Sequence, residues 1–83
     1  MAKPSETQKR KLRKLLRNLR EEAGLRQVDL ATRLKRPQSF VSKYESGEMA
    51  LGFLEVRQLC RILGVSFIDF ARRYEEEEGE DES

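Results

Sequence analysis

The sequence contains no histidine, no tryptophan and a single cysteine, Cys60. One cysteine cannot form an intrachain disulfide, and this usage is typical of a reducing cytosol. With one thiol and no imidazole, we expect no metal site and no activated nucleophile. No carboxylate dyad, phosphate-binding glycine loop or nucleophile–base pair can be assembled from the residues present. We therefore expect neither an enzyme nor a protein that needs a cofactor.

Long apolar runs are also missing. The longest one is far below the ~20 residues that a membrane-spanning helix needs, and the N-terminal segment MAKPSETQKRKL has no apolar core of a signal peptide. The sequence contains no run in which apolar and polar residues alternate, so no strand is predicted. The 83 residues suffice for one domain, with no second domain to sense a small molecule. We expect a cytoplasmic, nucleoid-associated protein that does not contact a membrane.

Charge is divided unevenly along the chain. Residues 75–83, EEEEGEDES, contain seven acidic groups and no base, so residues 1–74 carry 17 basic and eight acidic groups, a net charge of +9. A small domain with this excess of positive charge is suited to a polyanion, and nucleic acid is the partner we expect. The acidic segment predicts a disordered tail.

Five segments show helical signals. The first begins at a capping box, Ser5 with Gln8, and ends at Gly24. The next three cover about residues 27–35, 38–46 and 53–63, with Val28 and Leu54 among the positions expected to face inward. The fifth follows a second expected capping box, Ser66 with Asp69. These signals predict loose residues 1–4, an all-α domain of five helices at 5–74, and the tail at 75–83.

Residues 27–46, QVDLATRLKRPQSFVSKYES, contain two short helical patterns joined by a tight turn. Pro37 lacks an N–H and fits only at the start of the second helix, while Gly47 ends that helix because glycine accepts a positive φ. Val41 and Tyr44 fall on its inward face. Polar side chains fill the outward face: Gln38, Ser39, Ser42, Lys43 and Ser46. This is the layout of a helix-turn-helix, whose second helix lies in the major groove of DNA.

The stretch resembles the lambda repressor/Cro-like helix-turn-helix family, also called the XRE family. The matching residues are Gln27, Leu30, Ala31, Leu34, Gln38, Ser39, Val41, Ser42, Tyr44, Glu45, Gly47, Leu59, Leu63, Gly64 and Val65. The resemblance covers about residues 8–74 and implies a five-helix, lambda-repressor-like DNA-binding domain. Three residues differ from the family pattern: Arg26 and Pro37 replace capping residues, and Lys35 replaces a turn glycine.

Contacts to base edges would specify a DNA sequence, and contacts to phosphates would fix the register. Gln38 can pair with adenine, Lys43 can reach guanine, and Ser39 suits either kind of edge. The resemblance implies that these three positions read bases. It also implies that Gln27, at a positive helix end, binds a phosphate. Further phosphate candidates lie near the helix ends: Arg26, Thr32, Arg36, Ser46 and the Gly47 backbone.

Four other positions carry open expectations. Phe40 either touches a thymine methyl or covers the edge of the core, and Ser42 is a possible base contact. Glu45 is expected to pair with a basic side chain inside the domain, as the resemblance implies. Phe67 and Ile68 are expected in a dimer interface because the core is too small to bury every apolar residue of the last helix.

The resulting interpretation is a sequence-specific transcriptional regulator. We expect a repressor that binds an inverted repeat in double-stranded DNA as a homodimer. Three alternatives stay open at this point. They are an antitoxin-type regulator with a toxin as protein partner, a controller of a restriction–modification operon, and a protein–protein adaptor that has the fold but does not bind DNA.

Overall fold

The computed structural model describes residues 3–77, and within them the chain forms five helices and no strand. The helices are α1 (Glu6–Glu22), α2 (Gln27–Leu34), α3 (Gln38–Ser46), α4 (Phe53–Leu63) and α5 (Phe67–Glu76). The expected all-α, five-helix fold is confirmed. None of these helices is both long and apolar enough to cross a membrane.

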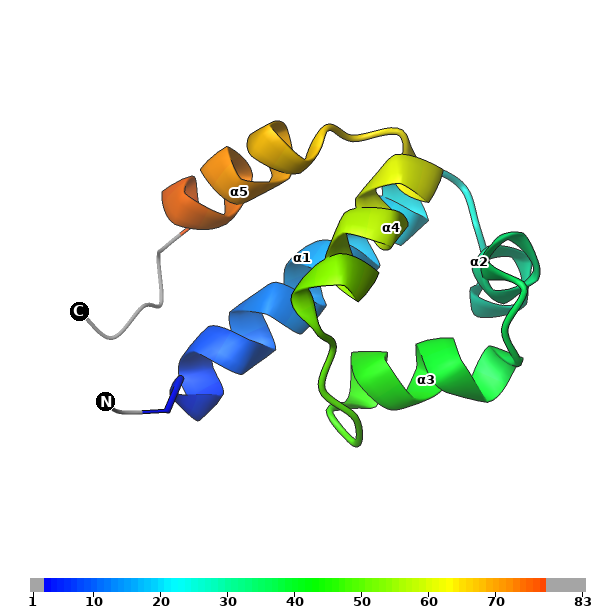
Figure 1. Cartoon of the computed structure of the whole chain (residues 1–83), viewed down its shortest axis with the longest axis horizontal. Helices are drawn as coiled ribbons and strands as arrows, with labels where there is room; N and C mark the ends of the chain where they lie inside the picture. Colours follow the sequence, from blue (N-terminus) through cyan, green and yellow to red (C-terminus); the bar gives the residue numbers. More distant parts are fainter. Residues whose placement is uncertain (1–2, 78–83) are drawn as a thin grey trace.

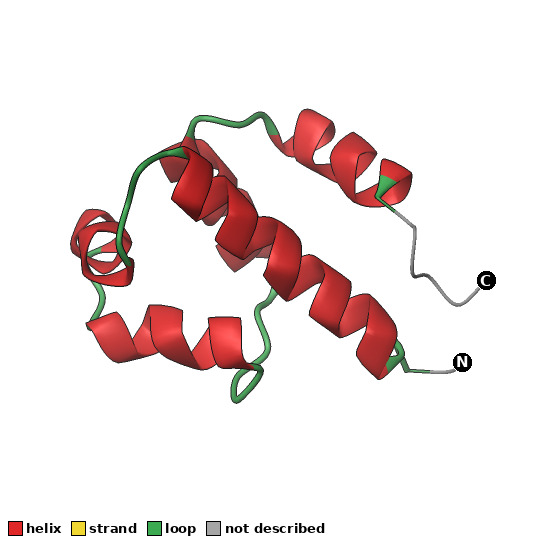
Figure 2. Ribbon diagram, turned by 180° about the vertical axis from the view of Figure 1, so that it is seen from behind, coloured by secondary structure: helices red, strands yellow, loops and turns green. Residues whose placement is uncertain are grey.

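Helix α1 is the central element. Figure 1 shows α2 and α3 beyond one side of it and α5 on the other, and the view from behind shows α1 running diagonally across the molecule (Figure 2). Helix α1 packs against both α3 and α5, and α2 packs against α3 and α4. The arrangement leaves the outer sides of α2 and α3 together at one end of the molecule, away from α5.

Local signals explain where α1 begins and ends. The Ser5 hydroxyl accepts a hydrogen bond from the Gln8 backbone N–H at 3.1 Å, and the Gln8 side chain accepts one from the Ser5 N–H at 2.9 Å. This is the predicted capping box. Leu15 and Leu16 are completely buried on the inner side of the helix. Beyond the last turn, Gly24 has a φ of +75°, a conformation that glycine adopts without strain.

The core is made by apolar residues of all five helices, but two expected members are outside it. Val28 is 39% exposed and Leu54 is 72% exposed. In α4 the buried residues are Val56, Leu59 and Cys60, which form a stripe at i, i+3 and i+4. At 100° per residue, Leu54 lies almost opposite this stripe. Val28 lies three residues before Ala31, at the margin of the buried stripe of α2 rather than opposite it, and is less exposed than Leu54. Both inward assignments were wrong.

The turn between α2 and α3 uses a strained backbone conformation. Helix α2 ends at Leu34, one residue before the expected end, because Lys35 adopts the left-handed conformation with φ 59° and ψ 42°. Within residues 3–77, Lys35 is the one non-glycine residue with a positive φ. It occupies the position where the family pattern has glycine, so the chain keeps the turn geometry and accepts the cost of the Cβ atom.

Replacing Lys35 by glycine is expected to stabilise the fold. The left-handed conformation costs an L-residue about 1–2 kcal/mol. Removing this strain would stabilise the folded protein, but glycine also gives the unfolded chain more conformational freedom, which offsets about 0.5–1 kcal/mol of the stabilisation. We expect K35G to raise the free energy of unfolding by about 0.5–1 kcal/mol, measured by urea denaturation. The control R33G, at an exposed position in the last turn of α2, is expected to lower it by up to about 1 kcal/mol. A K35G protein as destabilised as R33G would contradict the strain argument.

Helix α5 differs from its expected form at both ends. The Ser66 hydroxyl caps it by accepting from the Asp69 N–H at 3.0 Å, but the Asp69 carboxylate bonds to Arg72 and does not complete the predicted capping box. At the other end the helix continues through Glu75 and Glu76, which were expected in the disordered tail. Residues 1–2 and 78–83, included in the expectations for the two termini, lie outside the described residues.

Side chains on two faces of α5 hold it against α1. The Tyr74 hydroxyl donates a hydrogen bond to the Gln8 carbonyl oxygen at 3.2 Å, and the Lys11 ammonium lies 4.4 Å from the centre of the Tyr74 ring. Arg73 forms an ion pair with Glu22 at 2.8 Å. These contacts fix the position of α5 next to α1, far from the turn between α2 and α3.

Candidate nucleic-acid interface

Helix α3 is anchored on one side and exposed on the other. Val41 is 0% exposed and Tyr44 is 1% exposed, and both belong to the core. Gln38, Ser39 and Lys43, the three expected base-reading residues, are all exposed. The bounds of α3 are those expected from the sequence. The helix therefore presents a row of hydrogen-bonding side chains on a rigid support, as readout of base edges requires.

Ser42 lies at the margin of this row. It is half-buried, between the exposed outer face and the buried inner face of α3. A base contact by Ser42 stays a prediction.

A buried ion pair supports α3 from behind. Arg20 of α1 donates to both carboxylate oxygens of Glu45, at 2.7 and 3.0 Å, and to the Leu25 carbonyl oxygen at 2.8 Å. The exposed fractions of the two side chains are only 8% for Arg20 and 5% for Glu45. The hydrogen bond to Glu45 raises the pKa of Arg20 above its usual value. The internal ion pair expected for Glu45 is confirmed, and its partner comes from the first helix.

The same carboxylate also orients Gln27, which in turn contacts Gln38. Gln27, at the start of α2, donates its side-chain amide to Glu45 Oε1 at 2.9 Å. The Gln27 carbonyl oxygen accepts a long hydrogen bond of 3.5 Å from the side chain of Gln38. A continuous chain of polar contacts thus runs from buried Arg20 to the exposed first turn of α3. It holds the expected phosphate-binding residue, Gln27, beside an expected base-reading residue, Gln38.

Arg26 is restrained by an acidic neighbour. Its guanidinium donates two hydrogen bonds of 2.9 Å to Asp29, and its backbone N–H donates a third to the same carboxylate. Bonding to Arg26 lowers the pKa of Asp29 to about 2. Asp29 thus supplies the half of a capping box in which an acidic residue three positions after the N-cap accepts from the N-cap N–H, and its charge suits the positive helix end. No side chain of the N-cap residue itself accepts from the first turn of α2. A phosphate would have to share Arg26 with this carboxylate.

Arg36 and Phe40 pack against each other. The Arg36 guanidinium lies 4.3 Å from the centre of the Phe40 ring and 3.5 Å from the Glu55 carboxylate. Phe40 is 8% exposed, and its ring meets Tyr44 edge-on at a centroid distance of 5.6 Å. Of the two roles open for Phe40, the structure shows the second: its ring packs over the edge of the hydrophobic core. The ring is enclosed by protein on these sides, and a thymine contact by Phe40 stays a prediction.

The remaining phosphate candidates have local partners. The Thr32 hydroxyl donates to the Val28 carbonyl oxygen at 2.9 Å, and the Ser46 hydroxyl donates to the Lys43 carbonyl oxygen at 3.1 Å. The Gly47 backbone N–H bonds to the Tyr44 carbonyl oxygen at 3.3 Å. Thr32 and Ser46 are exposed and keep acceptor capacity. The Gly47 N–H is already used to end α3, so it is a poor donor for a phosphate.

Arg13 lies close to this surface, although nothing in the sequence distinguished it from the other basic residues of α1. A Cβ atom placed on Gly47 would lie 3.0 Å from Arg13 Cζ, so the guanidinium rests directly on the end of α3. The positive charge complements the negative end of the helix dipole there. Gly47 itself has a φ of +92°. A residue with a side chain would be strained in this conformation and would have to displace the Arg13 guanidinium.

The surface formed by α2 and α3 is strongly basic. Residues 26–43 contain five cationic side chains and one carboxylate. All five cations are exposed: Arg26, Arg33, Lys35, Arg36 and Lys43. Such a surface attracts the phosphate backbone of a nucleic acid. The geometry thus combines exposed hydrogen-bonding groups on α3 with cations on α3 itself, on α2 and in the turn between them.

Comparison with known proteins agrees with this geometry. A family profile described as a helix-turn-helix domain matches residues 11–72. Among solved structures, the XRE-family like protein from Pseudomonas syringae pv. tomato str. DC3000 is similar, with a TM-score of 0.78 and 39% sequence identity over 83% of this chain and 84% of that chain. No curated protein matches. The fold, the α2–turn–α3 geometry and these two matches lead to one conclusion. The chain belongs to the XRE family of lambda repressor/Cro-like helix-turn-helix domains.

Proposed function

We propose that this protein is a transcriptional repressor that binds an inverted repeat in double-stranded DNA as a homodimer. The observation that carries the proposal is the exposed row on α3, Gln38, Ser39 and Lys43, held by the buried Arg20–Glu45 pair behind it. A rigid α3 with polar outer side chains is the part of a helix-turn-helix that enters the major groove. A bound repressor would exclude other proteins from the same DNA segment.

The proposed contacts fall into two groups. Gln38, Ser39 and Lys43 read base edges, with Ser42 at the margin of the same surface. Gln27 binds a phosphate with the amide hydrogen that Glu45 does not use, since a side-chain amide has two donors. Further phosphate contacts come from exposed side chains beside the helix ends: Arg26, Thr32, Arg36 and Ser46.

Selection from a random double-stranded DNA pool is the direct test. The proposal predicts enrichment of a short inverted repeat whose half-sites are about one helical turn, roughly 34 Å, apart. Binding should weaken steeply with salt, because phosphate contacts release counterions. Enrichment of single half-sites would argue against the homodimer. No binding even at low salt would favour the protein–protein adaptor with the same fold.

The start of α5 is the proposed dimer contact, with one change from the sequence-based expectation. Phe67 is half-buried between two rings, with centroid distances of 5.0 Å to Phe53 and 6.3 Å to Phe70. Ile68 is 71% exposed, and Phe53 is 69% exposed. An exposed Ile68 beside partly exposed aromatic rings is the kind of apolar surface that association buries. Ile68 is therefore a better candidate for the interface than Phe67.

Replacing Ile68 by aspartate is expected to convert a dimer into a monomer. The charged group would have to lose its water in the interface, which strongly disfavours association. The measurement is sedimentation at micromolar concentration, combined with affinity for the selected inverted repeat. Leu54→Asp serves as the matched control, because Leu54 is exposed to the same degree, 72%. An I68D protein that dimerises like the parent, or an L54D protein that dissociates equally, would contradict the assignment.

A further inference from the structure

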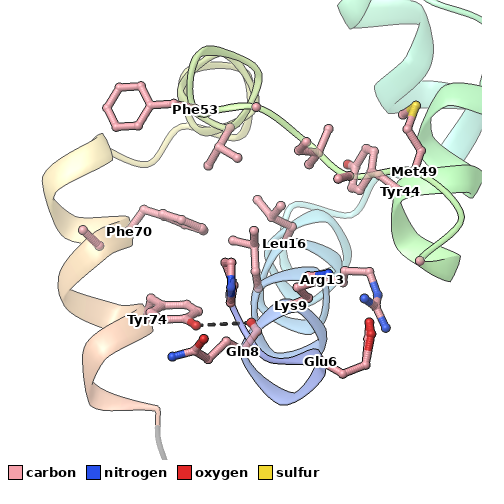
Figure 3. Close-up of a pocket in the computed structure, with 18 of the residues that line it drawn as sticks. Glu6, Gln8, Lys9, Arg13, Leu16, Tyr44, Met49, Phe53, Phe70 and Tyr74 are labelled. Atoms are coloured by element: carbon pink, nitrogen blue, oxygen red, sulfur yellow. Dashed lines mark hydrogen bonds between the residues drawn. The ribbon is translucent and has the colours of Figure 1, made fainter. Parts of the chain in front are cut away.

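A cavity of about 680 Å³ lies between α1, α5 and the segment that joins α3 to α4 (Figure 3). This volume is within the range of small-molecule sites, roughly 300–1,000 Å³. Its lining includes Leu12, Leu16, Met49, Val56, Phe67 and Phe70. In Figure 3 the Phe70 and Tyr74 side chains of α5 reach toward α1, where Leu16 and Gln8 face them. The walls are thus aliphatic and aromatic and come from segments far apart in the sequence.

One polar group in this apolar lining has no partner. Tyr44 lines the cavity and is 1% exposed, and its hydroxyl is buried without a hydrogen-bond partner among the described residues. Burial raises the pKa of Tyr44 above its usual value, so the hydroxyl keeps its proton at neutral pH. A buried hydroxyl without an acceptor costs free energy, and most such groups in proteins are satisfied. A donor that needs an acceptor therefore lies covered in the wall of the cavity.

The charges at the rim do not favour a ligand of either sign. Lys9 and Arg13 line the cavity together with Glu6 and Glu75. Two cations and two carboxylates leave this part of the surface without net charge. An ionic ligand would also lose its water against the apolar walls, which is costly for a charge. The chemistry of the lining fits a neutral molecule with a large apolar part.

We propose that the cavity binds a small, uncharged, mainly apolar molecule that carries one hydrogen-bond acceptor for the Tyr44 hydroxyl. Because that hydroxyl is covered, an occupant reaches it when a neighbouring side chain moves. Met49 is in the lining, and methionine is unbranched and adapts its shape easily. The occupant contacts α3 at Tyr44, in the last half of the helix and next in sequence to Lys43. The domain would then hold a small molecule between its own helices.

Benzophenone and diphenylmethane form a matched pair of probes for this proposal. Both contain two phenyl rings on one carbon, but only benzophenone has a carbonyl acceptor. Binding is measured on the full chain without DNA, by calorimetry and by amide chemical shifts. Benzophenone is expected to bind about 3- to 10-fold more tightly, the usual gain from one neutral hydrogen bond. Its shift changes should concentrate at Leu16, Tyr44 and Phe70.

Tyr44→Phe isolates the hydroxyl. This variant should bind the two probes equally while keeping the affinity of the parent for diphenylmethane. Because the hydroxyl has no partner to lose, the Tm of Y44F should equal or exceed that of the parent. A second variant, Ala71→Phe, fills the cavity from α5 and should weaken both probes at least tenfold.

Three outcomes would overturn the proposal. They are equal binding of the two probes by the parent, shift changes outside the cavity, and a Y44F protein with a lowered Tm. The last would show that the hydroxyl already has a partner, such as a bound water. Because none of these measurements includes DNA, a negative result leaves the proposed repressor function intact, and failure of the repressor function leaves the ligand test unaffected.

Discussion

Replacing Glu45 by alanine is expected to lower the free energy of unfolding by about 3 kcal/mol, the scale of a broken buried ion pair. The change leaves Arg20 buried at 8% exposure, with its strongest partner removed. It also frees the Gln27 amide, which donates to Glu45 at 2.9 Å. Urea denaturation measures the effect, and the midpoint should fall while the slope stays constant.

Two comparisons separate this pair from ordinary surface charges. Arg17→Ala breaks an ion pair with Glu21 whose side chains are 61% and 52% exposed, and it should cost less than about 1 kcal/mol. The double variant R20M/E45L replaces the buried charges by apolar side chains of similar length. It should recover much of the loss, since two apolar groups have no charge to desolvate. An E45A protein no less stable than the R17A protein would show that the buried pair contributes little.

Alanine at Gln38 or Lys43 is expected to cost about 1–3 kcal/mol in binding to the selected DNA sequence. Each change removes a side chain that can make paired contacts to one base, so the preference at one or two base pairs should relax. The readout is the affinity for a set of DNAs with single base changes, measured at one salt concentration. For Gln38→Ala, binding to unrelated DNA should change little because the amide carries no charge.

Lys14 provides the control for Lys43. It is also exposed but lies on α1, outside the α2–turn–α3 unit. Lys14→Ala should leave the base preference intact and alter affinity only through the loss of one positive charge. If Q38A and K43A both keep the full base preference of the parent, α3 does not read the DNA in the proposed orientation.

The helices were largely predictable because their signals are local. The Ser5–Gln8 capping box and the bounds of α3 depend on residues only a few positions apart. Asp29 was within reach of the same reasoning, since it lies three residues after Arg26 at the start of a helix. The end of α2 was misplaced by one residue. A left-handed lysine at position 35 cannot be foreseen from propensity, because glycine is the residue expected there.

Contacts between distant segments were beyond a single sequence. Arg20 is 25 positions from Glu45, and any of several basic residues on α1 was an equally good partner. The exposure of Leu54 depends on which face of α4 meets the core, and an apolar residue alone does not reveal it. The cavity beside Tyr44 arises from the spacing of α1 and α5. The base-reading and phosphate-binding roles are predictions that rest on residue type and position.

The position of Cys60 makes its thiol a natural reporter of transient opening of the fold. It is the one cysteine in the sequence, it is 0% exposed, and burial raises the pKa of its thiol to about 11. In alkylation the thiolate is the nucleophile that attacks the reagent, so the sulfur must be exposed and deprotonated. Alkylation can therefore proceed only during the brief intervals when α4 separates from the core. The rate of covalent labelling would report how often α4 opens under native conditions, without denaturant and without any engineered probe.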